Sequence, residues 1–237
     1  MKFVIVRHGE RIDKVDPNWL ATAEHPTDPF LSDVGLEQAR FVGQHLKRTE
    51  NVTRIIVSPF TRTLQTATEI NKSLDLPLCV EPGICEWLNP EWHRGAPFYW
   101  PPLEDAKLKF PGIQSDYKPL LSPPDHEDRI AVRSRVGKFA NLLVASLAPA
   151  TAENGPVKEE TVLLVTHGKI VEELAVSWTR VEEFPWVTYC CVTQVVQLPT
   201  SGPPPSFRLG DSVCDVSFLP DAIRPHDSPK REIATYA

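Results

Sequence analysis

The stretch KFVIVRHGE at residues 2–10 decides the fold expected of this chain. Its first five residues are β-branched, aromatic or otherwise mostly apolar, which is typical of a strand buried on both faces of a parallel sheet. The run ends abruptly at Arg7 and His8, where a loop is expected. A second stretch, TVLLVTHG at residues 161–168, has the same plan and ends at His167. The two stretches predict two buried parallel strands, each with a histidine directly after it.

Strands and helices alternate along the rest of the chain. Further strands are expected at residues 54–57, 78–80, 190–198 and 207–209. Helices are expected over residues 33–47, 61–74, 127–147 and 169–178, the first of them capped by Asp33. This alternation predicts an α/β fold with a doubly wound, mainly parallel sheet. Such sheets bind ligands at the carboxyl ends of their strands.

Length and composition favour one globular unit. The 237 residues are 41% hydrophobic and 24% charged, which is close to the averages of soluble domains. We expect a domain over residues 1–219 and a loose C-terminal tail over residues 220–237. Within the domain, residues 87–125 are rich in proline and tryptophan and predict an irregular insertion near the ligand-binding edge of the sheet. Its aromatic residues either line a substrate cleft or pack among themselves; they are Trp87, Trp92, Phe98, Tyr99 and Trp100.

Charge, hydropathy and cysteine content restrict the partners and the location. The formal net charge of −6 and the pI near 5.7 argue against nucleic acid or an anionic membrane as a ligand. No apolar run reaches the roughly 20 residues that a membrane span needs. The five cysteines include no C-x-x-C pair, which favours reduced thiols over disulfides or a zinc site. We therefore expect a cytoplasmic protein with no membrane span and no nucleic-acid partner, and the sequence leaves a homodimer open.

Arginine and histidine residues gather where the strands end. Arg7, His8 and Arg11 lie at the end of the first strand or just after it, and Arg62 lies in the first turn of the helix expected from residue 61. Guanidinium groups bind phosphate oxygens in a bidentate manner, and an imidazole can form a covalent bond with phosphorus. These residues predict a site for a phosphoryl group. The alternative for His8 is an ordinary loop histidine beside a surface ion pair.

Four segments of the chain, taken in order, resemble the motifs of the histidine phosphatase superfamily, also called the phosphoglycerate mutase-like fold. They are RHGE at 7–10, LSDVGLEQA at 31–39, SPFTRTLQTA at 58–67 and VTHG at 165–168. The resemblance spans roughly residues 2–198. Segments 7–13 and 80–88 resemble, more narrowly, the phosphatase domain of the TULA proteins, the suppressors of T-cell receptor signalling, and the related ecdysteroid-phosphate phosphatases.

The resemblance implies that the protein hydrolyses a phosphomonoester through a phosphohistidine on His8, with no metal and no other cofactor. It implies that the catalytic residues are His8, Glu86 and His167. It implies that the phosphate-binding residues are Arg7, Arg11, Arg62 and His167. The sequence itself agrees about the metal, because neither histidine has a second histidine or a carboxylate cluster at the spacing of a metal site.

Two of these residues have alternatives in the sequence. Arg11 matches the additional arginine of the narrower group, or it pairs with Glu10 or Asp13 as an ordinary surface charge. Glu86 matches the family's acid, which protonates the leaving oxygen and later takes a proton from water. Its apolar neighbours predict a raised pKa. The other acids of the same loop are Glu81, Glu91, Glu104 and Asp105.

The narrower resemblance implies phosphotyrosine, or a small aryl or steroid phosphate, as the substrate. A phosphoglycerate mutase or a sugar bisphosphatase is an alternative. Mutase activity is disfavoured because residues 11–13 read Arg-Ile-Asp where the mutases have a serine and a stretch that binds the sugar phosphate. A further alternative is a catalytically silent adaptor that binds phosphorylated ligands. The complete set of His8, Arg62 and His167 argues against silence.

Overall fold

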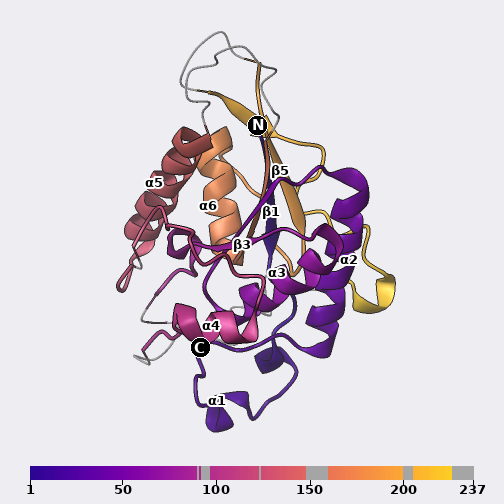
Figure 1. Cartoon of the computed structure of the whole chain (residues 1–237), viewed down its shortest axis with the longest axis vertical. Helices are drawn as coiled ribbons and strands as arrows, with labels where there is room; N and C mark the ends of the chain where they lie inside the picture. Colours follow the sequence, from indigo (N-terminus) through magenta and orange to yellow (C-terminus); the bar gives the residue numbers. More distant parts are fainter. Residues whose placement is uncertain (90, 92–96, 123, 148–159, 200–204, 226–237) are drawn as a thin grey trace.

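A six-stranded mixed sheet forms the centre of the protein (Figure 1). The computed structural model describes residues 1–89, 91, 97–122, 124–147, 160–199 and 205–225. The strands are β1 (Lys2–Arg7), β2 (Arg54–Val57), β3 (Leu78–Val80), β4 (Thr161–Thr166), β5 (Val192–Gln197) and β6 (Phe207–Leu209). Their order is β3-β2-β4-β1-β5-β6. The first four in this order run parallel, whereas β5 is antiparallel to β1 and β6 to β5. The expected mainly parallel sheet is confirmed.

Helices cover both faces of the sheet. Those on one face are α2 (Asp33–Thr49) and α3 (Thr61–Leu74), and those on the other are α5 (Arg129–Leu147) and α6 (Gly168–Thr179). Side chains of β1 alternate between the two layers, because successive residues of a strand point to opposite faces. Val4 and Val6 pack with α2 and α3, while Phe3 and Ile5 pack with α5 and α6. The result is the three-layer α/β/α arrangement of a doubly wound fold.

The start of α2 fixes the loop that follows β1. Ser32, not the expected Asp33, caps the helix: its Oγ accepts a hydrogen bond from Gly35 N at 3.0 Å and donates one to Glu10 Oε1 at 2.7 Å. A Cβ on Gly9 would collide with the backbone carbonyl of Gly35, so only glycine allows this close approach. The loop that carries His8 therefore lies directly against the first turn of α2.

The proline- and tryptophan-rich insertion is irregular over most of its described length, as expected. It contains one short helix, α4 (Leu103–Lys109), and the 3₁₀ turn η2 (Pro82–Ile84) precedes it. Residues 112–114 return along the free edge of β3, where Leu78 N donates to Gly112 O and Gln114 N donates to Leu78 O, both at 2.9 Å. Trp92 lies outside the described residues. The insertion thus covers the edge of the sheet beside the strand that leads to Glu86.

Shorter elements occupy the ends of the domain. Between β1 and α2 lie η1 (Ile12–Lys14) and α1 (Trp19–Thr22). At the other end of the chain, η4 (Asp221–Ile223) packs against α2, where Ile223 O accepts a hydrogen bond from Gln38 Nε2 at 2.8 Å. The first residues of the expected loose tail are therefore held to the domain, and residues 226–237 lie outside the described part.

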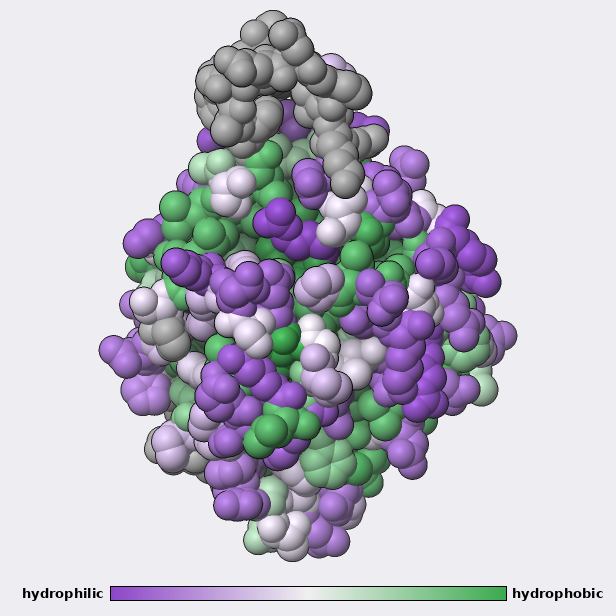
Figure 2. Space-filling view, viewed as in Figure 1, coloured by the Kyte–Doolittle hydropathy of each residue, from purple (hydrophilic) through white to green (hydrophobic). Residues whose placement is uncertain are grey.

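The surface mixes polar and apolar residues. On the face drawn in Figure 2, apolar residues lie among hydrophilic ones, and the most exposed large apolar side chains, Leu108 and Ile130, lie on different helices. Among the helices that the structure describes, none combines the length and the apolar character needed to cross a membrane. A homodimer stays a prediction.

Candidate active site

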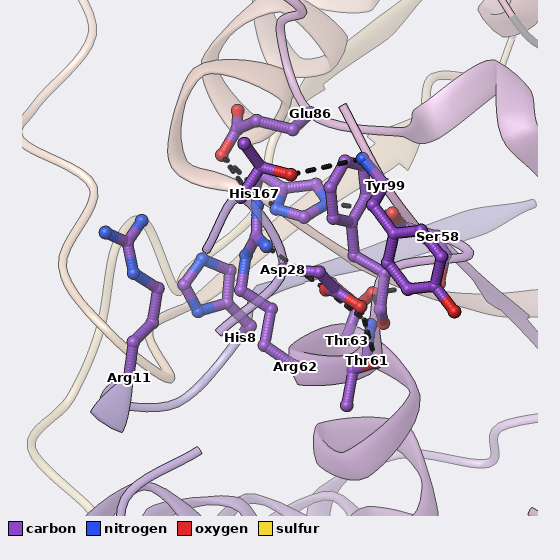
Figure 3. Close-up of polar contacts among 12 residues, drawn as sticks. His8, Arg11, Asp28, Ser58, Thr61, Arg62, Thr63, Glu86, Tyr99 and His167 are labelled. Carbon is purple, nitrogen blue, oxygen red and sulfur yellow. Dashed lines mark hydrogen bonds and ion pairs between the residues drawn. The ribbon is translucent and has the colours of Figure 1, made fainter. Parts of the chain in front are cut away.

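Three strand ends bring the predicted residues together. His8 follows β1, Ser58 follows β2 and His167 follows β4, and these strands are neighbours in the sheet. His8 N donates a hydrogen bond to Thr166 O at 2.9 Å, which sets the loop after β1 beside the end of β4. The rings of His8 and His167 lie 5.3 Å apart, and Figure 3 shows both within one cluster of polar side chains.

His8 is held as a neutral imidazole whose buried Nε2 carries a lone pair. Its ring is almost fully buried, and Nδ1 lies 2.8 Å from Gly9 O. Because a carbonyl oxygen only accepts, Nδ1 carries the proton and Nε2 carries the lone pair. Within the described residues Nε2 has no hydrogen-bond partner. Burial first, and then the positive charges of Arg62 and Arg7, lower the pKa of His8 well below its usual value.

Arg62 lies in the first turn of α3, as the sequence predicts, and points into the same cluster. Its side chain is buried, and its guanidinium lies over the Phe60 ring at 4.4 Å. Nη1 lies 3.5 Å from Asp28 Oδ1, and Nη2 lies 3.5 Å from Glu86 Oε2. Asp28 also accepts a hydrogen bond from Thr61 N at 2.9 Å, so it holds both the arginine and the start of its helix. Sequence analysis missed Asp28, which lies in a stretch with no periodicity.

Arg7 and Arg11 approach His8 from the end of β1. Arg7 Nη1 donates to Val187 O at 2.7 Å, and its guanidinium lies over the Tyr189 ring at 4.2 Å. Arg11 binds Asp13 with two hydrogen bonds, from Nε at 2.8 Å and from Nη2 at 2.6 Å. This is the pairing that the sequence left open for Arg11. Arg11 nevertheless lies close enough to His8 to contribute to the lowering of its pKa.

Glu86 and His167 form a contact pair beside His8. His167 Nδ1 lies 3.3 Å from Glu86 Oε2, and its Nε2 lies 2.7 Å from Ser58 Oγ. Burial lowers the pKa of His167 to about 4, against the opposing charge of Glu86. Burial alone would raise the pKa of Glu86, but His167 and Arg62 together lower it well below its usual range. The raised pKa of Glu86 expected from its apolar neighbours is therefore wrong.

The other acids of the loop lie elsewhere. Glu81 is fully buried, and its carboxylate accepts hydrogen bonds from Gly83 N, Tyr117 Oη and Leu120 N at 2.7–2.8 Å. Glu81 therefore holds the insertion together. The remaining three acids, Glu91, Glu104 and Asp105, are exposed. Of the candidate acids, Glu86 is the one in contact with His167 and Arg62.

The fold creates a group that could hold a metal, although the sequence spacing did not suggest one. Ligand atoms of His8, Glu86 and His167 all lie within 4.8 Å of one another. The charges around them favour an anion instead, because Arg62 and Arg7 bring positive charge to His8 and add to the effect of burial in lowering its pKa. The same field repels a divalent cation and attracts a phosphate dianion.

Aromatic residues of the insertion pack against the site rather than only among themselves. Phe98 and Trp100 contact a small buried cluster of Phe60, Cys85 and Leu88. The Phe60 ring in turn meets the His167 ring edge-on at 5.2 Å. Two further aromatic residues have partners outside the insertion: Trp87 Nε1 donates to Glu127 O at 2.9 Å, and the Tyr99 ring stacks on His25 at 3.4 Å. The insertion is therefore attached to the loop that carries Glu86.

Comparison with known proteins agrees with this geometry. The family model of the histidine phosphatase superfamily (branch 1) matches residues 3–201. Ubiquitin-associated and SH3 domain-containing protein A of Mus musculus is 33% identical over 150 residues, which cover 50% of this chain and 24% of that protein. The transcription factor tau 55 kDa subunit of Saccharomyces cerevisiae is 30% identical over 174 residues, which cover 69% of this chain and 37% of that protein. The chain thus spans less than two fifths of the length of either relative.

A solved structure shows the same fold over almost the whole length. The ecdysone phosphate phosphatase from Bombix mori, in complex with tungstate, has a TM-score of 0.72 and 18% sequence identity, covering 98% of this chain and 99% of that chain. This similarity supports the expected phosphoglycerate mutase-like α/β fold. Since the family model covers most of the chain, this protein belongs to the histidine phosphatase superfamily, branch 1.

Proposed function

We propose that the protein hydrolyses phosphomonoesters through a phosphohistidine on His8, without a metal. The observation that carries this proposal is the state of His8: Nδ1 is occupied by Gly9 O, and the Nε2 lone pair stands in a buried, positively charged site. An imidazole that stays neutral at pH 7 can attack phosphorus without first losing a proton. A guanidinium environment also attracts the doubly charged phosphoryl group that it attacks.

The arginines and His167 supply the binding of the phosphoryl oxygens. Phosphoryl transfer spreads negative charge over the equatorial oxygens, so fixed positive groups around phosphorus stabilise the transition state. Arg62 is held by Phe60 and Asp28, and Arg7 by Val187 and Tyr189, which keeps both guanidiniums in place before the substrate arrives. Arg11 lies beside His8 and adds a further positive charge, which its ion pair with Asp13 partly neutralises.

Glu86 is the proposed general acid and base. In the absence of substrate it is ionised, because His167 and Arg62 lower its pKa. A bound phosphate dianion shares these two groups and adds its own negative charge, so the pKa of Glu86 rises and the carboxylate takes up a proton. That proton passes to the ester oxygen while the His8 Nε2–P bond forms and the P–O bond breaks. In the second step the carboxylate removes a proton from the water that attacks phosphorus and releases His8.

The proposed substrates are phosphotyrosine or small aryl or steroid phosphates. Two observations support an apolar leaving group: Phe98 and Trp100 pack beside Phe60, which contacts His167, and the solved relative named above is an ecdysone phosphate phosphatase. We also propose a cytoplasmic location, in keeping with the reduced cysteines expected from the sequence. The described cysteines are all free thiols.

Turnover of para-nitrophenyl phosphate tests the proposal. We expect the wild-type protein to release para-nitrophenolate and inorganic phosphate, and His8→Ala to lose this activity. His45→Ala is the matched control, because His45 lies on α2 and stacks on Phe218 at 4.3 Å, outside the site. A silent adaptor would bind phosphate without turnover, and a mutase would pass the phosphoryl group to a sugar phosphate in preference to water. Either result would contradict the proposal.

A further inference from the structure

A buried arginine on α5 holds the loop that carries Glu86. Arg135 is 9% exposed and lies in the same helix stripe as Val132, Val136 and Phe139, which face the core. Its guanidinium reaches the loop that follows β3. Nη1 donates to Gly83 O at 2.8 Å and to Cys85 O at 3.2 Å, and Nη2 donates to Glu86 O at 3.2 Å. One side chain therefore binds three backbone carbonyls of a four-residue segment.

Glu127 completes this arrangement from the other side. Its two carboxylate oxygens accept hydrogen bonds from Arg135 Nε and Nη2, both at 2.7 Å. The backbone of Glu127 also binds the residues that follow Glu86: its carbonyl accepts from Trp87 Nε1 at 2.9 Å, and its N–H donates to Leu88 O at 3.1 Å. The ion pair thus holds the loop on both sides of Glu86.

A second contact ties the same loop to the end of β4. Thr166 Oγ1 donates to Ile84 O at 2.7 Å, and Thr166 directly precedes His167. The carboxylate of Glu86 itself accepts a hydrogen bond from Trp87 N at 3.0 Å. These contacts hold the backbone and the carboxylate of Glu86 in an orientation in which Oε2 lies 3.3 Å from His167 Nδ1.

We propose that Arg135, paired with Glu127, is the positioning residue for the general acid. This inference rests on the proposed function of Glu86. A general acid and base must reach both the ester oxygen and the later water, and a displacement of about 1 Å can cost a hundredfold in rate. In the part of the chain that the structure describes, Arg135 makes no hydrogen bond or ion pair with His8, Arg7 or Arg62. Its loss should therefore damage proton transfer to the leaving group while leaving attack by His8 largely intact.

Two variants test whether Arg135 positions Glu86 or only stabilises the fold. Arg135→Gln combined with Glu127→Gln removes the Arg135–Glu127 ion pair. Because both charges are removed together, no buried charge is left unpaired, and an unpaired buried charge is strongly destabilising. Arg135→Lys keeps the charge beside Glu127, but a single ammonium cannot reproduce the planar fork that binds Glu127 and three carbonyls together. If the double variant does not fold, Arg135→Lys carries the test.

The matched control lies two residues away on the same helix. Arg133 pairs with Glu173 of α6, which is buried, through an Nε–Oε2 contact of 3.0 Å. Arg133→Gln with Glu173→Gln therefore removes a second arginine–glutamate pair of α5. Among the described residues, this pair binds α5 to α6 and does not contact the loop that carries Glu86. Thermal unfolding of all variants shows whether the fold is retained.

The readout is the first turnover with two leaving groups. An alkyl phosphate needs a proton on its departing oxygen, whereas para-nitrophenolate leaves unaided, so loss of acid function affects the first far more. We expect both Arg135 variants to slow the burst of alcohol release at least about tenfold and the burst of para-nitrophenolate less than about threefold. The Arg133 control should slow neither. In a Glu86→Gln background, removing the Arg135–Glu127 ion pair should cause no further loss of burst rate with the alkyl phosphate.

The outcomes keep the two proposals apart. If the wild-type protein hydrolyses neither ester, the proposed function fails. If Glu86→Gln slows both esters equally, the acid assignment fails. If Glu86→Gln separates the esters but folded Arg135 variants slow both equally, or neither, Arg135 is only a structural residue and the inference is overturned. If Arg135 variants in the Glu86→Gln background lose further burst rate with the alkyl phosphate only, the inference is also overturned, because the Arg135–Glu127 ion pair would then act through a group other than Glu86.

Discussion

The buried histidines should make the stability of the fold depend on pH between 7 and 5. His167 is fully buried, and its pKa is lowered from 6.5 to about 4. Between pH 6.5 and about pH 4, the unfolded chain binds a proton on this residue and the native chain does not. Stability must therefore fall as the pH falls. For His167 alone, the two pKa values give a loss of about 2 kcal/mol between pH 7 and pH 5. His8, whose pKa is also lowered, adds to the loss.

Urea unfolding followed by tryptophan fluorescence measures this dependence. The free energy of unfolding in water is extrapolated at pH 7, 6 and 5 for the wild-type protein and for His167→Gln. Glutamine is polar but cannot titrate, so the variant should lose less stability over this range by about 2 kcal/mol. His126→Gln replaces an exposed histidine and serves as the control for a histidine-to-glutamine change outside the site.

Two results would refute the reasoning. Equal pH dependence in the wild type and in His167→Gln would mean that His167 takes up its proton in the native state as readily as in the unfolded one. A wild-type protein that gains stability from pH 7 to pH 5 would mean that groups with raised native pKa values outweigh both histidines. Absolute stabilities at pH 7 do not enter the comparison, since the substitution also alters the contacts of Ser58 and Glu86.

Three further outcomes are expected. Arg62→Ala should lower kcat about a hundredfold with the fold retained, because it removes a preorganised charge from the transition state; near-full turnover would exclude Arg62 from the pocket. Exhaustive chelation with EDTA should leave hydrolysis unchanged, whereas loss of activity that a divalent ion restores would show that His8, Glu86 and His167 bind a metal. Rapid quench and mass spectrometry under alkaline conditions should find an acid-labile phosphate on His8, and phosphate found instead on Ser58 would reassign the nucleophile.

The strand ends could be predicted from the sequence because their signal is local. An apolar run that stops at Arg-His-Gly or Thr-His-Gly marks the end of a buried strand, and parallel strands bring such ends to one edge. The cap of α2 was predicted one residue late, since Ser32 and Asp33 are both good N-cap residues and the choice depends on the contact with Glu10.

Other features depend on contacts that no local pattern encodes. The pKa of Glu86 is lowered by His167 and Arg62, which approach from two other segments of the chain, so its apolar sequence neighbours gave the wrong direction. Asp28 lies in an unpatterned stretch and becomes important only through Arg62. Arg135 did leave a signal, an arginine within the apolar stripe of a predicted helix, but the three carbonyls that it binds lie 49 to 52 residues away in the sequence.

The side-chain amide of Gln38 has a practical consequence for anyone who shortens this protein. Its Oε1 accepts a hydrogen bond from Glu10 N at 3.0 Å, and its Nε2 donates to Ile223 O. One amide thus links the loop that carries His8 to the last described turn of the chain. Trimming at residue 219, where the sequence suggests that the domain ends, would remove the partner of Gln38 Nε2, and Gln38 Oε1 binds the backbone of Glu10, two residues after His8. An expression fragment for crystallisation or screening should therefore extend at least through Pro225.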